Sequence, residues 1–313
     1  MRVAVMGAGG TGGYFGSLLA RAGEEVTFIA RGPHLKAIRA RGLSVKSRLA
    51  GDFTVPAEAT DDPSRVGAVD LVLFCVKAYD TDTAAQQIQP LIGPETMILS
   101  VQNGIDNEER IARVVGDEPV IGGVAQVSSV IEAPGVVAQT AGAGRLIFGE
   151  LAGGSSPRTE RLLSAFQKAG IAAVRHPDIR VALWEKFLLI CAFGGLTALT
   201  RLPIGPILAC HETSTMFRGT MAEVEAIGRV SGIALPAECV DQVFAMAAGV
   251  EPWARGSLYH DLATGRRLEL EVLNGTVVRL GRERGVPTPL NFAIYAALKP
   301  YADGAPTLPE GPP

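Results

Sequence analysis

Short apolar runs alternate with helical stretches along the first third of the chain. Four runs are apolar at nearly every position: residues 3–6, 26–30, 71–76 and 97–101. Runs of this kind are typical of parallel strands buried on both faces. Residues 13–22 predict the helix between the first two runs, and Gly23 ends it. The pattern therefore predicts an α/β, Rossmann-type N-terminal domain with a mostly parallel sheet.

A hairpin is predicted where these apolar runs end. Residues 124–140, VAQVSSVIEAPGVVAQT, read as one strand, a Pro-Gly turn and a second strand. The sheet is therefore expected to finish with antiparallel strands.

The pattern becomes helical almost throughout after Pro177. Breaks at Gly or Pro separate the expected helices, which are Ile179–Thr200, 214–231, 236–248 and 268–284. This half is therefore predicted to be an all-α C-terminal domain. The expected division is a cofactor-binding domain over 1–177, a helical substrate and catalytic domain over 178–303, and a disordered Pro- and Gly-rich tail over 304–313.

The length of 313 residues suits two domains, and 47% of the residues are hydrophobic. The formal net charge is −3 and no basic stripe occurs, which argues against nucleic-acid binding. No apolar run predicts a membrane span, and the N-terminal MRVAVMGAGG lacks the pattern of a signal peptide. The cysteines are scattered without a CxxC motif, at Cys75, Cys191, Cys210 and Cys239. We therefore expect a cytoplasmic protein with reduced thiols and no bound metal.

A glycine-rich turn follows the first predicted strand and opens the first predicted helix. It fits G-x-G-x-x-G and consists of Gly7, Ala8, Gly9, Gly10, Thr11 and Gly12. An ordinary glycine-rich turn is the competing interpretation, but the place at the start of a βαβ unit favours dinucleotide binding. In that role Gly7 permits the turn, Gly9 lets the backbone approach a pyrophosphate, and Gly12 lets helix and strand pack closely.

Arg31 follows the second predicted strand, where NAD enzymes carry an Asp or Glu for the ribose hydroxyls. A carboxylate there would repel a 2′-phosphate, whereas a guanidinium pairs with it. The sequence therefore predicts NADP(H) as the cofactor. The alternative is that Arg31 is only a solvated loop charge.

Four polar residues occupy positions that suit chemistry. Lys77 and Asn103 each follow a predicted strand, at the sheet edge where open α/β sheets bind ligands, although a lysine there is often only solvated. Lys186 lies in the apolar stretch ALWEKFLL, where an amine either reaches solvent or is used, for instance as a proton donor. Glu269 lies in LELEVLNG, where it and Glu271 are by default surface carboxylates.

Ordered motifs run from Met1 to about Pro300. They are GAGGTGG at 7–13, ARG at 30–32, VKA at 76–78, QNG at 102–104, LWEK at 183–186, LTAL at 196–199, SLYHD at 257–261, and Glu269 followed by Asn274-Gly275. Together they resemble the ketopantoate reductase (2-dehydropantoate 2-reductase) family. The resemblance implies a Rossmann domain, an all-helical domain and an active site between them. It also implies NADPH-dependent reduction of ketopantoate to pantoate, a step of pantothenate biosynthesis.

The resemblance implies roles for individual residues. Lys186 would be the proton donor, and Glu269 would hold it and hydrogen-bond near the cofactor. Asn103 would touch both cofactor and substrate. Ser257 would hold the substrate carboxylate.

Further contacts follow from the same resemblance. Arg31 and Lys77 would bind the adenosine phosphate end or the ribose of NADPH. The partner would be a small-molecule 2-keto acid, and a homodimer is one assembly that the chain could form.

The sequence departs from the family at three substrate contacts. Members typically carry Asn four and eight positions after the catalytic lysine, on the same helix face, and a further Asn in a later loop. Here these positions are Ile190, Gly194 and Ile204. An apolar site does not reject a substrate for lacking hydroxyls. A paralogue that reduces a less polar or bulkier 2-keto acid than ketopantoate is therefore the alternative.

Other interpretations stay open. A 3-hydroxy acid or polyol-phosphate dehydrogenase has a similar layout, but Arg31 and the Ser257 and Glu269 motifs argue against it. A non-catalytic NADPH-sensing protein would have no need of Lys186 or Asn103. A purely structural protein would have no use for the glycine loop.

Overall fold

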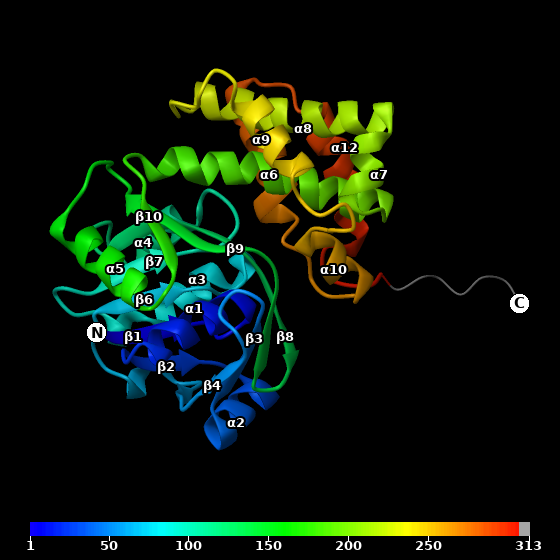
Figure 1. The fold of residues 1–313 in the computed structure, drawn as a ribbon. Coiled ribbons are helices and arrows are strands. Elements are labelled where there is room, and N and C mark those ends of the chain that lie inside the picture. The colour runs from blue at the N-terminus through cyan, green and yellow to red at the C-terminus, as the bar shows by residue number, and fades with distance from the viewer. Residues whose placement is uncertain (307–313) are drawn as a thin grey trace, which may run out of the picture. The chain divides into compact units, whose positions relative to one another are not determined.

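The computed structural model describes residues 1–306, and the chain forms two compact units. The first unit runs from Met1 to Ala182 and the second begins at Leu183 (Figure 1). Helix α6 (Ile179–Thr200) begins in the first unit and continues into the second. Most of the tail predicted at 304–313 lies outside the described residues.

A ten-stranded sheet forms the centre of the first unit. Its parallel part has the strand order β5-β2-β1-β6-β7-β8, the order of a Rossmann sheet. The strands are β1 (Arg2–Met6), β2 (Glu25–Ile29), β5 (Glu58–Thr60), β6 (Leu71–Phe74), β7 (Met97–Ser100) and β8 (Val120–Ala133). The predicted Rossmann-type, mostly parallel sheet is confirmed.

The sheet continues beyond β8 in the predicted hairpin. Strand β9 (Val136–Glu150) pairs antiparallel with β8 across the turn at Pro134 and Gly135, and this confirms the hairpin. Three short strands complete this side of the sheet. Strands β3 (Leu43–Ser47) and β10 (Ala172–Arg175) are both parallel to β9, and β4 (Phe53–Val55) is antiparallel to β3. These short strands were not predicted, because their polar and apolar residues alternate over only a few positions.

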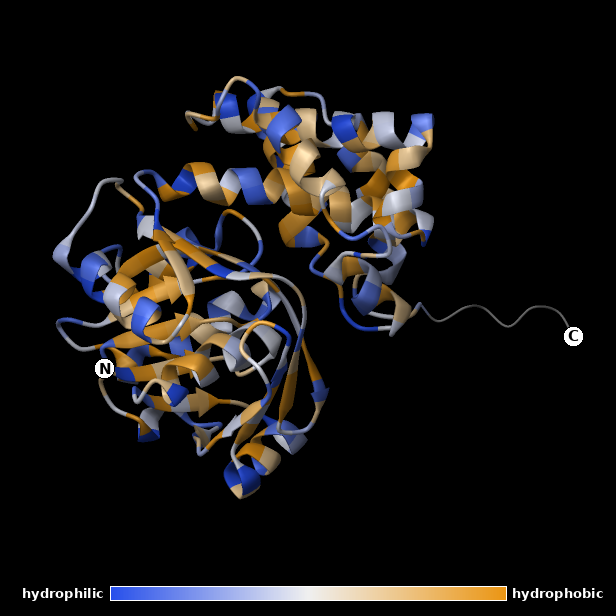
Figure 2. Cartoon of the chain, viewed as in Figure 1, coloured by the Kyte–Doolittle hydropathy of each residue, from blue (hydrophilic) through white to orange (hydrophobic). Residues whose placement is uncertain are grey.

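Strand β1 is apolar at successive positions because it is covered on both faces. Val5 packs into a cluster with Phe15, whereas its neighbour Met6 packs into a second cluster with Phe74. Side chains from α1 (Gly10–Arg21), α2 (Gly32–Arg41) and α5 (Pro157–Lys168) join the first cluster. Side chains from α3 (Thr81–Gln87) and α4 (Asn107–Val115) join the second. Figure 2 shows the resulting hydrophobic strands at the centre of this unit.

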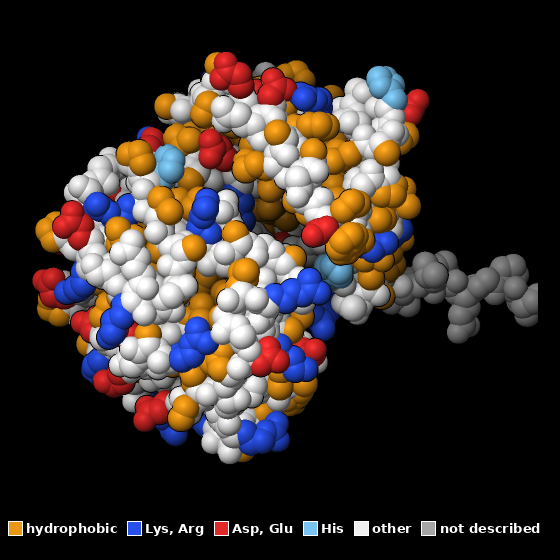
Figure 3. Space-filling view, viewed as in Figure 1, with side chains coloured by type: hydrophobic (Ala, Val, Ile, Leu, Met, Phe, Trp, Pro, Cys, Tyr) orange, Lys and Arg blue, Asp and Glu red, His pale blue; other side chains and the backbone are white. Residues whose placement is uncertain are grey.

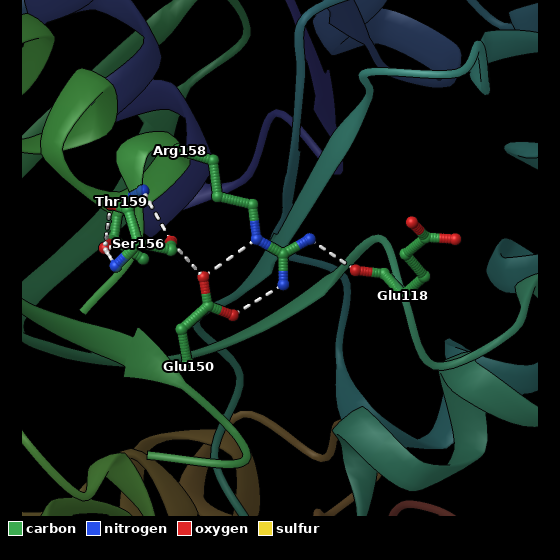
Figure 4. Close-up of polar contacts among 5 residues, drawn as sticks. All are labelled: Glu118, Glu150, Ser156, Arg158 and Thr159. Carbon is green, nitrogen blue, oxygen red and sulfur yellow. Dashed lines mark hydrogen bonds and ion pairs between the residues drawn. The ribbon is translucent and has the colours of Figure 1, made fainter. Parts of the chain in front are cut away.

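A group of polar contacts ties the end of β9 to the start of α5 (Figure 4). The Arg158 guanidinium donates from Nε to Glu150 Oε1 at 2.8 Å and from Nη2 to Oε2 at 2.5 Å. A further nitrogen of Arg158 donates to the Glu118 carbonyl, and the Ser156 hydroxyl donates to Glu150. The hydrogen bond from Arg158 holds the pKa of the Glu150 carboxyl below its ordinary value of 4.5, against the opposing effect of burial.

The second unit is helical, and within residues 183–306 it has no strand. Its helices after α6 are α7 (Ile204–Ala209), α8 (His211–Val230), α9 (Cys239–Ala248), α10 (Ser257–Ala263), α11 (Thr276–Arg284) and α12 (Pro289–Leu298). The predicted all-α character is therefore confirmed. The single helix predicted over 268–284 is wrong, because Glu271–Gly275 forms a π-helical turn that precedes α11.

Helix α6 has the length and the apolar composition of a membrane span, with 22 residues. Most of its apolar window is buried within the protein, as it is in core helices of soluble proteins. The expectation that no segment is apolar enough to span a membrane is therefore wrong for α6. A single buried helix of this kind is weak evidence for a membrane protein.

Candidate functional site

Three glycines of the G-x-G-x-x-G motif, one in the loop after β1 and two in the first turn of α1, are required by packing. A Cβ atom on Gly10 would lie 2.0 Å from the Ser129 carbonyl oxygen, and one on Gly12 would lie 2.3 Å from the Gly7 carbonyl oxygen. Gly7 has φ +96° and would bring a Cβ to 2.9 Å from the Val76 nitrogen. The loop therefore lies against β8 and against the end of β6.

Gly9 differs from these three. Its φ of −73° and ψ of −160° suit any residue, and a Cβ there would meet nothing within 4 Å. Neither conformation nor packing requires a glycine at this position. Gly9 is also the N-cap of α1 and offers no side-chain cap, and the first turn contains no acidic residue. An uncapped helix start beside a bare backbone fits the pyrophosphate of a dinucleotide, with Ala8 and Thr11 on either side.

Arg31 lies two residues after the end of β2 and is the N-cap of α2. Its side chain is 86% exposed and forms an ion pair with Asp80 at 3.1 Å. Asp80 ends the 3-10 turn Ala78–Asp80, which follows Lys77 directly. An exposed pair of this kind contributes little stability, so the guanidinium can turn to a phosphate dianion. The structure thus brings the Arg31 and Lys77 segments together at one edge of the sheet.

A buried hydrogen-bond network links the Lys77 and Asn103 segments. Gln102 donates from Nε2 to the Val76 carbonyl and to Thr81 Oγ1, both at 2.9 Å. Asn107 donates from Nδ2 to the Asn103 carbonyl at 2.9 Å. The Asn103 amide is partly exposed and has no hydrogen-bond partner among residues 1–306. Its backbone is therefore fixed while its side chain is available to a ligand. The sequence analysis assigned no role to Gln102, although it belongs to the QNG motif, and did not identify Thr81.

Lys186 lies on a partly exposed stripe of α6. Leu189, Ile190 and Phe193, three, four and seven positions further on, are also partly exposed. Residues at these spacings share one helix face. The surface that continues from the lysine is therefore apolar.

Farther along α6, Gly194 lies against the segment that carries Ser257. A Cβ on Gly256 would lie 2.7 Å from the Gly194 Cα, so the two backbones are in direct contact. The Gly256 N–H donates to the buried Thr197 hydroxyl at 3.1 Å. Ser257, the first residue of α10, is exposed. Thr197 thus positions Ser257, a function that the LTAL motif did not reveal.

The two carboxylates of the LELE stretch have different environments. Glu269 is 5% exposed, and the Glu269 carbonyl accepts a hydrogen bond from the Leu273 N–H at 3.2 Å, at the π-helical turn. Glu271 is exposed and forms an ion pair with Lys299. The default interpretation as a surface carboxylate is therefore wrong for Glu269 and confirmed for Glu271.

Two other sequence positions serve packing. Asn274 is fully buried and donates to Asn291 Oδ1 at 2.9 Å and to the Cys191 carbonyl at 3.3 Å, which ties the π-helical turn to α6. Ile204 is 1% exposed, and its N–H donates to the Ala254 carbonyl. The Ile204 side chain therefore belongs to the core.

Metal ligation has no support in residues 1–306, and the cysteines differ in burial. No group of three or more His, Cys, Asp or Glu side chains there could hold a metal ion. All four cysteines are free thiols. Burial raises the pKa of the Cys239 thiol to about 11.

Lys and Arg side chains are interspersed with Asp and Glu on the face in Figure 3.

The first unit combines a Rossmann sheet, a glycine loop with an unfilled position at Gly9, and polar groups at one sheet edge. These features define the class of dinucleotide-binding oxidoreductases. Residues 3–153 match the family described as ketopantoate reductase PanE/ApbA, and residues 178–302 match its C-terminal part. The chain belongs to this family.

Similar proteins span the whole chain. A 2-dehydropantoate 2-reductase of Mesorhizobium japonicum is 32% identical and covers 96% of this chain and 98% of its own. A PanE/ApbA family ketopantoate reductase from Ralstonia eutropha has a crystal structure that is 36% identical, with a TM-score of 0.89, 96% of this chain and 98% of that one covered. The 2-dehydropantoate 2-reductase from Geobacter metallireducens is 35% identical, with a TM-score of 0.89, and the match covers 96% of this chain and 99% of that chain.

Proposed function

We propose that this protein is an NADPH-dependent reductase that converts a 2-keto acid to a 2-hydroxy acid, with ketopantoate as the first candidate substrate. The observation that carries the cofactor half of the proposal is Gly9, where a side chain is absent without a structural need for its absence. Family membership carries the reaction type.

The first unit would bind the cofactor. The loop from Gly7 to Gly12 would hold the pyrophosphate, and Arg31 and Lys77 would bind the ribose or phosphate of the adenosine end. Asn103 would reach the nicotinamide end with its unpartnered amide. When bound, the reduced nicotinamide supplies a hydride.

The second unit would act on the keto acid. Lys186 would stabilise the negative charge that grows on the carbonyl oxygen and would then donate a proton to it. Glu269 is buried and lies two residues before the π-helical turn. Its carboxylate would orient Lys186. Ser257 would donate a hydrogen bond to the substrate carboxylate, and Asn103 would complete its orientation.

A less polar or bulkier 2-keto acid is the second candidate substrate. Leu189, Ile190 and Phe193 give the surface next to Lys186 its apolar character, and Gly194 adds no polar group. Such a surface cannot hydrogen-bond a substrate hydroxyl, so it gains nothing from one. A preference for a 2-keto acid with an unhydroxylated or bulkier side chain over ketopantoate would support this second candidate.

The test is NADPH oxidation across a panel of 2-keto acids that includes ketopantoate and its unhydroxylated branched analogues. A catalytic efficiency that is orders of magnitude higher for ketopantoate would rule out the second candidate. Lys186→Ala should lose most of kcat and still bind NADPH. Wild-type turnover in that variant would remove Lys186 from the mechanism, and NADPH binding without turnover of any keto acid would favour a sensor.

Two further features belong to this proposal. A cytoplasmic enzyme is expected, because NADPH is a soluble cellular cofactor and the thiols are free. A homodimer is the assembly we propose, and sedimentation of the purified protein tests it.

A further inference from the structure

We infer that Arg255 is an additional substrate-binding residue, which pairs with the carboxylate of the 2-keto acid beside Ser257. The inference rests on the proposed function, because it concerns the acid group of the same substrate.

Arg255 differs from the other arginines in the described part of the second unit. Arg255 is partly buried, and the remaining ones are exposed: Arg201, Arg218, Arg229, Arg266, Arg267, Arg279, Arg282 and Arg284. Several of these pair with a carboxylate, as Arg218 does with Asp241. A guanidinium that loses water normally gains a partner in return.

Arg255 has no such partner among residues 1–306. Within the described part of the chain, no carboxylate lies within ion-pair distance of its guanidinium, and none of its side-chain nitrogens makes a hydrogen bond. Its Nε is covered by protein, whereas the two terminal nitrogens are not among the buried atoms. The end of the guanidinium is therefore the part that can receive a ligand.

The ring of Tyr259 fixes the direction of the Arg255 side chain. The guanidinium carbon lies 4.9 Å from the ring centroid, which is the geometry of a cation–π contact. A planar guanidinium held in this way loses little further freedom when it pairs with an anion. The contact preorganises the group and leaves its charge uncompensated.

The residues that follow Arg255 lie in the part of the second unit to which we assign substrate binding. Gly256, the next residue, lies against Gly194 of α6, two helical turns beyond Lys186. Ser257 follows and is exposed. A 2-keto acid is an anion whose carboxylate adjoins the reacting carbonyl. Two terminal N–H groups and a serine hydroxyl match the oxygens of that carboxylate.

The test compares a 2-keto acid that the wild-type enzyme reduces with the neutral methyl ester of the same acid. KM and kcat are measured from NADPH oxidation for the wild type, Arg255→Gln and Arg255→Lys. Arg218→Gln is the matched control, since it removes the same charge from a guanidinium that also stacks on a ring but already has a carboxylate partner. Thermal unfolding checks that each variant is folded.

Arg255→Gln should raise KM for the acid about 10- to 100-fold, the range of a lost charged hydrogen bond, and leave KM for the ester nearly unchanged. The KM of Arg255→Lys for the acid should lie between those of the wild type and Arg255→Gln, because lysine keeps the charge but cannot form two parallel hydrogen bonds to the carboxylate. An equal rise for acid and ester, or none, would overturn the inference and leave Arg255 as a packing residue for α10. Failure of the wild type to reduce any 2-keto acid would instead refute the proposed function.

Discussion

The substitution Gly9→Ala tests cofactor binding by the glycine loop independently of folding. Gly9→Ala adds a Cβ that meets no protein atom within 4 Å, at a backbone conformation that alanine adopts freely. Loss of glycine flexibility in the unfolded chain stabilises by about 0.4–1 kcal/mol. Alanine is a poorer N-cap than glycine by a similar amount. The net change in the free energy of unfolding should therefore be within about 0.5 kcal/mol of zero.

The same methyl group would occupy the space proposed for the pyrophosphate. One charge-assisted hydrogen bond to the loop contributes about 1.5–3 kcal/mol, so losing one should weaken NADPH binding about 10- to 150-fold. Fluorescence titration with NADPH and thermal unfolding of the same sample measure the two effects.

Gly10→Ala is the control for this experiment. Its Cβ would lie 2.0 Å from a backbone carbonyl oxygen, so it should destabilise the fold by about 3 kcal/mol or more. If Gly9→Ala folds normally and binds NADPH with the wild-type Kd, the glycine loop is not the pyrophosphate site.

Three further substitutions test other parts of the site and the fold. Thr197→Val leaves a buried N–H without its acceptor and should raise KM for the keto acid several-fold with little change in NADPH affinity; Thr220→Val, an equally buried helical threonine, should leave KM unchanged. Asp80→Asn frees Arg31 and should tighten NADPH binding more than NADH binding in calorimetric titrations, and equal effects would contradict the pairing. Glu150 has a pKa lowered below 4.5 in the folded state, so its contribution to stability is present above pH 4.5 and lost as the pH falls through the lowered value. Glu150→Gln should therefore flatten the acid loss of stability measured by urea unfolding, and an unchanged slope would refute this.

The parallel strands and the long helices could be predicted because their signal is local. Strand β1 is apolar throughout, since both of its faces are covered, and the Pro-Gly turn at 134–135 is visible in the sequence. Strand β3 and helix α10 could not be predicted, because each is short and is held by residues far away in the chain.

The site shows the same limit. The glycine loop and Arg31 could be located by their distance from a strand. Burial of Glu269 and exposure of Glu271 depend on a π-helical turn, which periodicity does not reveal. The roles of Thr197 and Arg255 depend on contacts between α6 and the segment before α10, and on what is missing around the guanidinium.

The two adjacent glycines of α6 differ in the space available for a side chain. At Gly195 a methyl group would lie 2.9 Å from Ile294, whereas at Gly194 the nearest atom, on Leu258, is at an ordinary 3.6 Å. A methyl group at position 194 thus meets only an ordinary van der Waals contact, whereas one at position 195 requires Ile294 to shift. Position 194 is therefore the one of the two at which a single small substitution can alter the helix face that continues from Lys186 while the neighbouring core is kept.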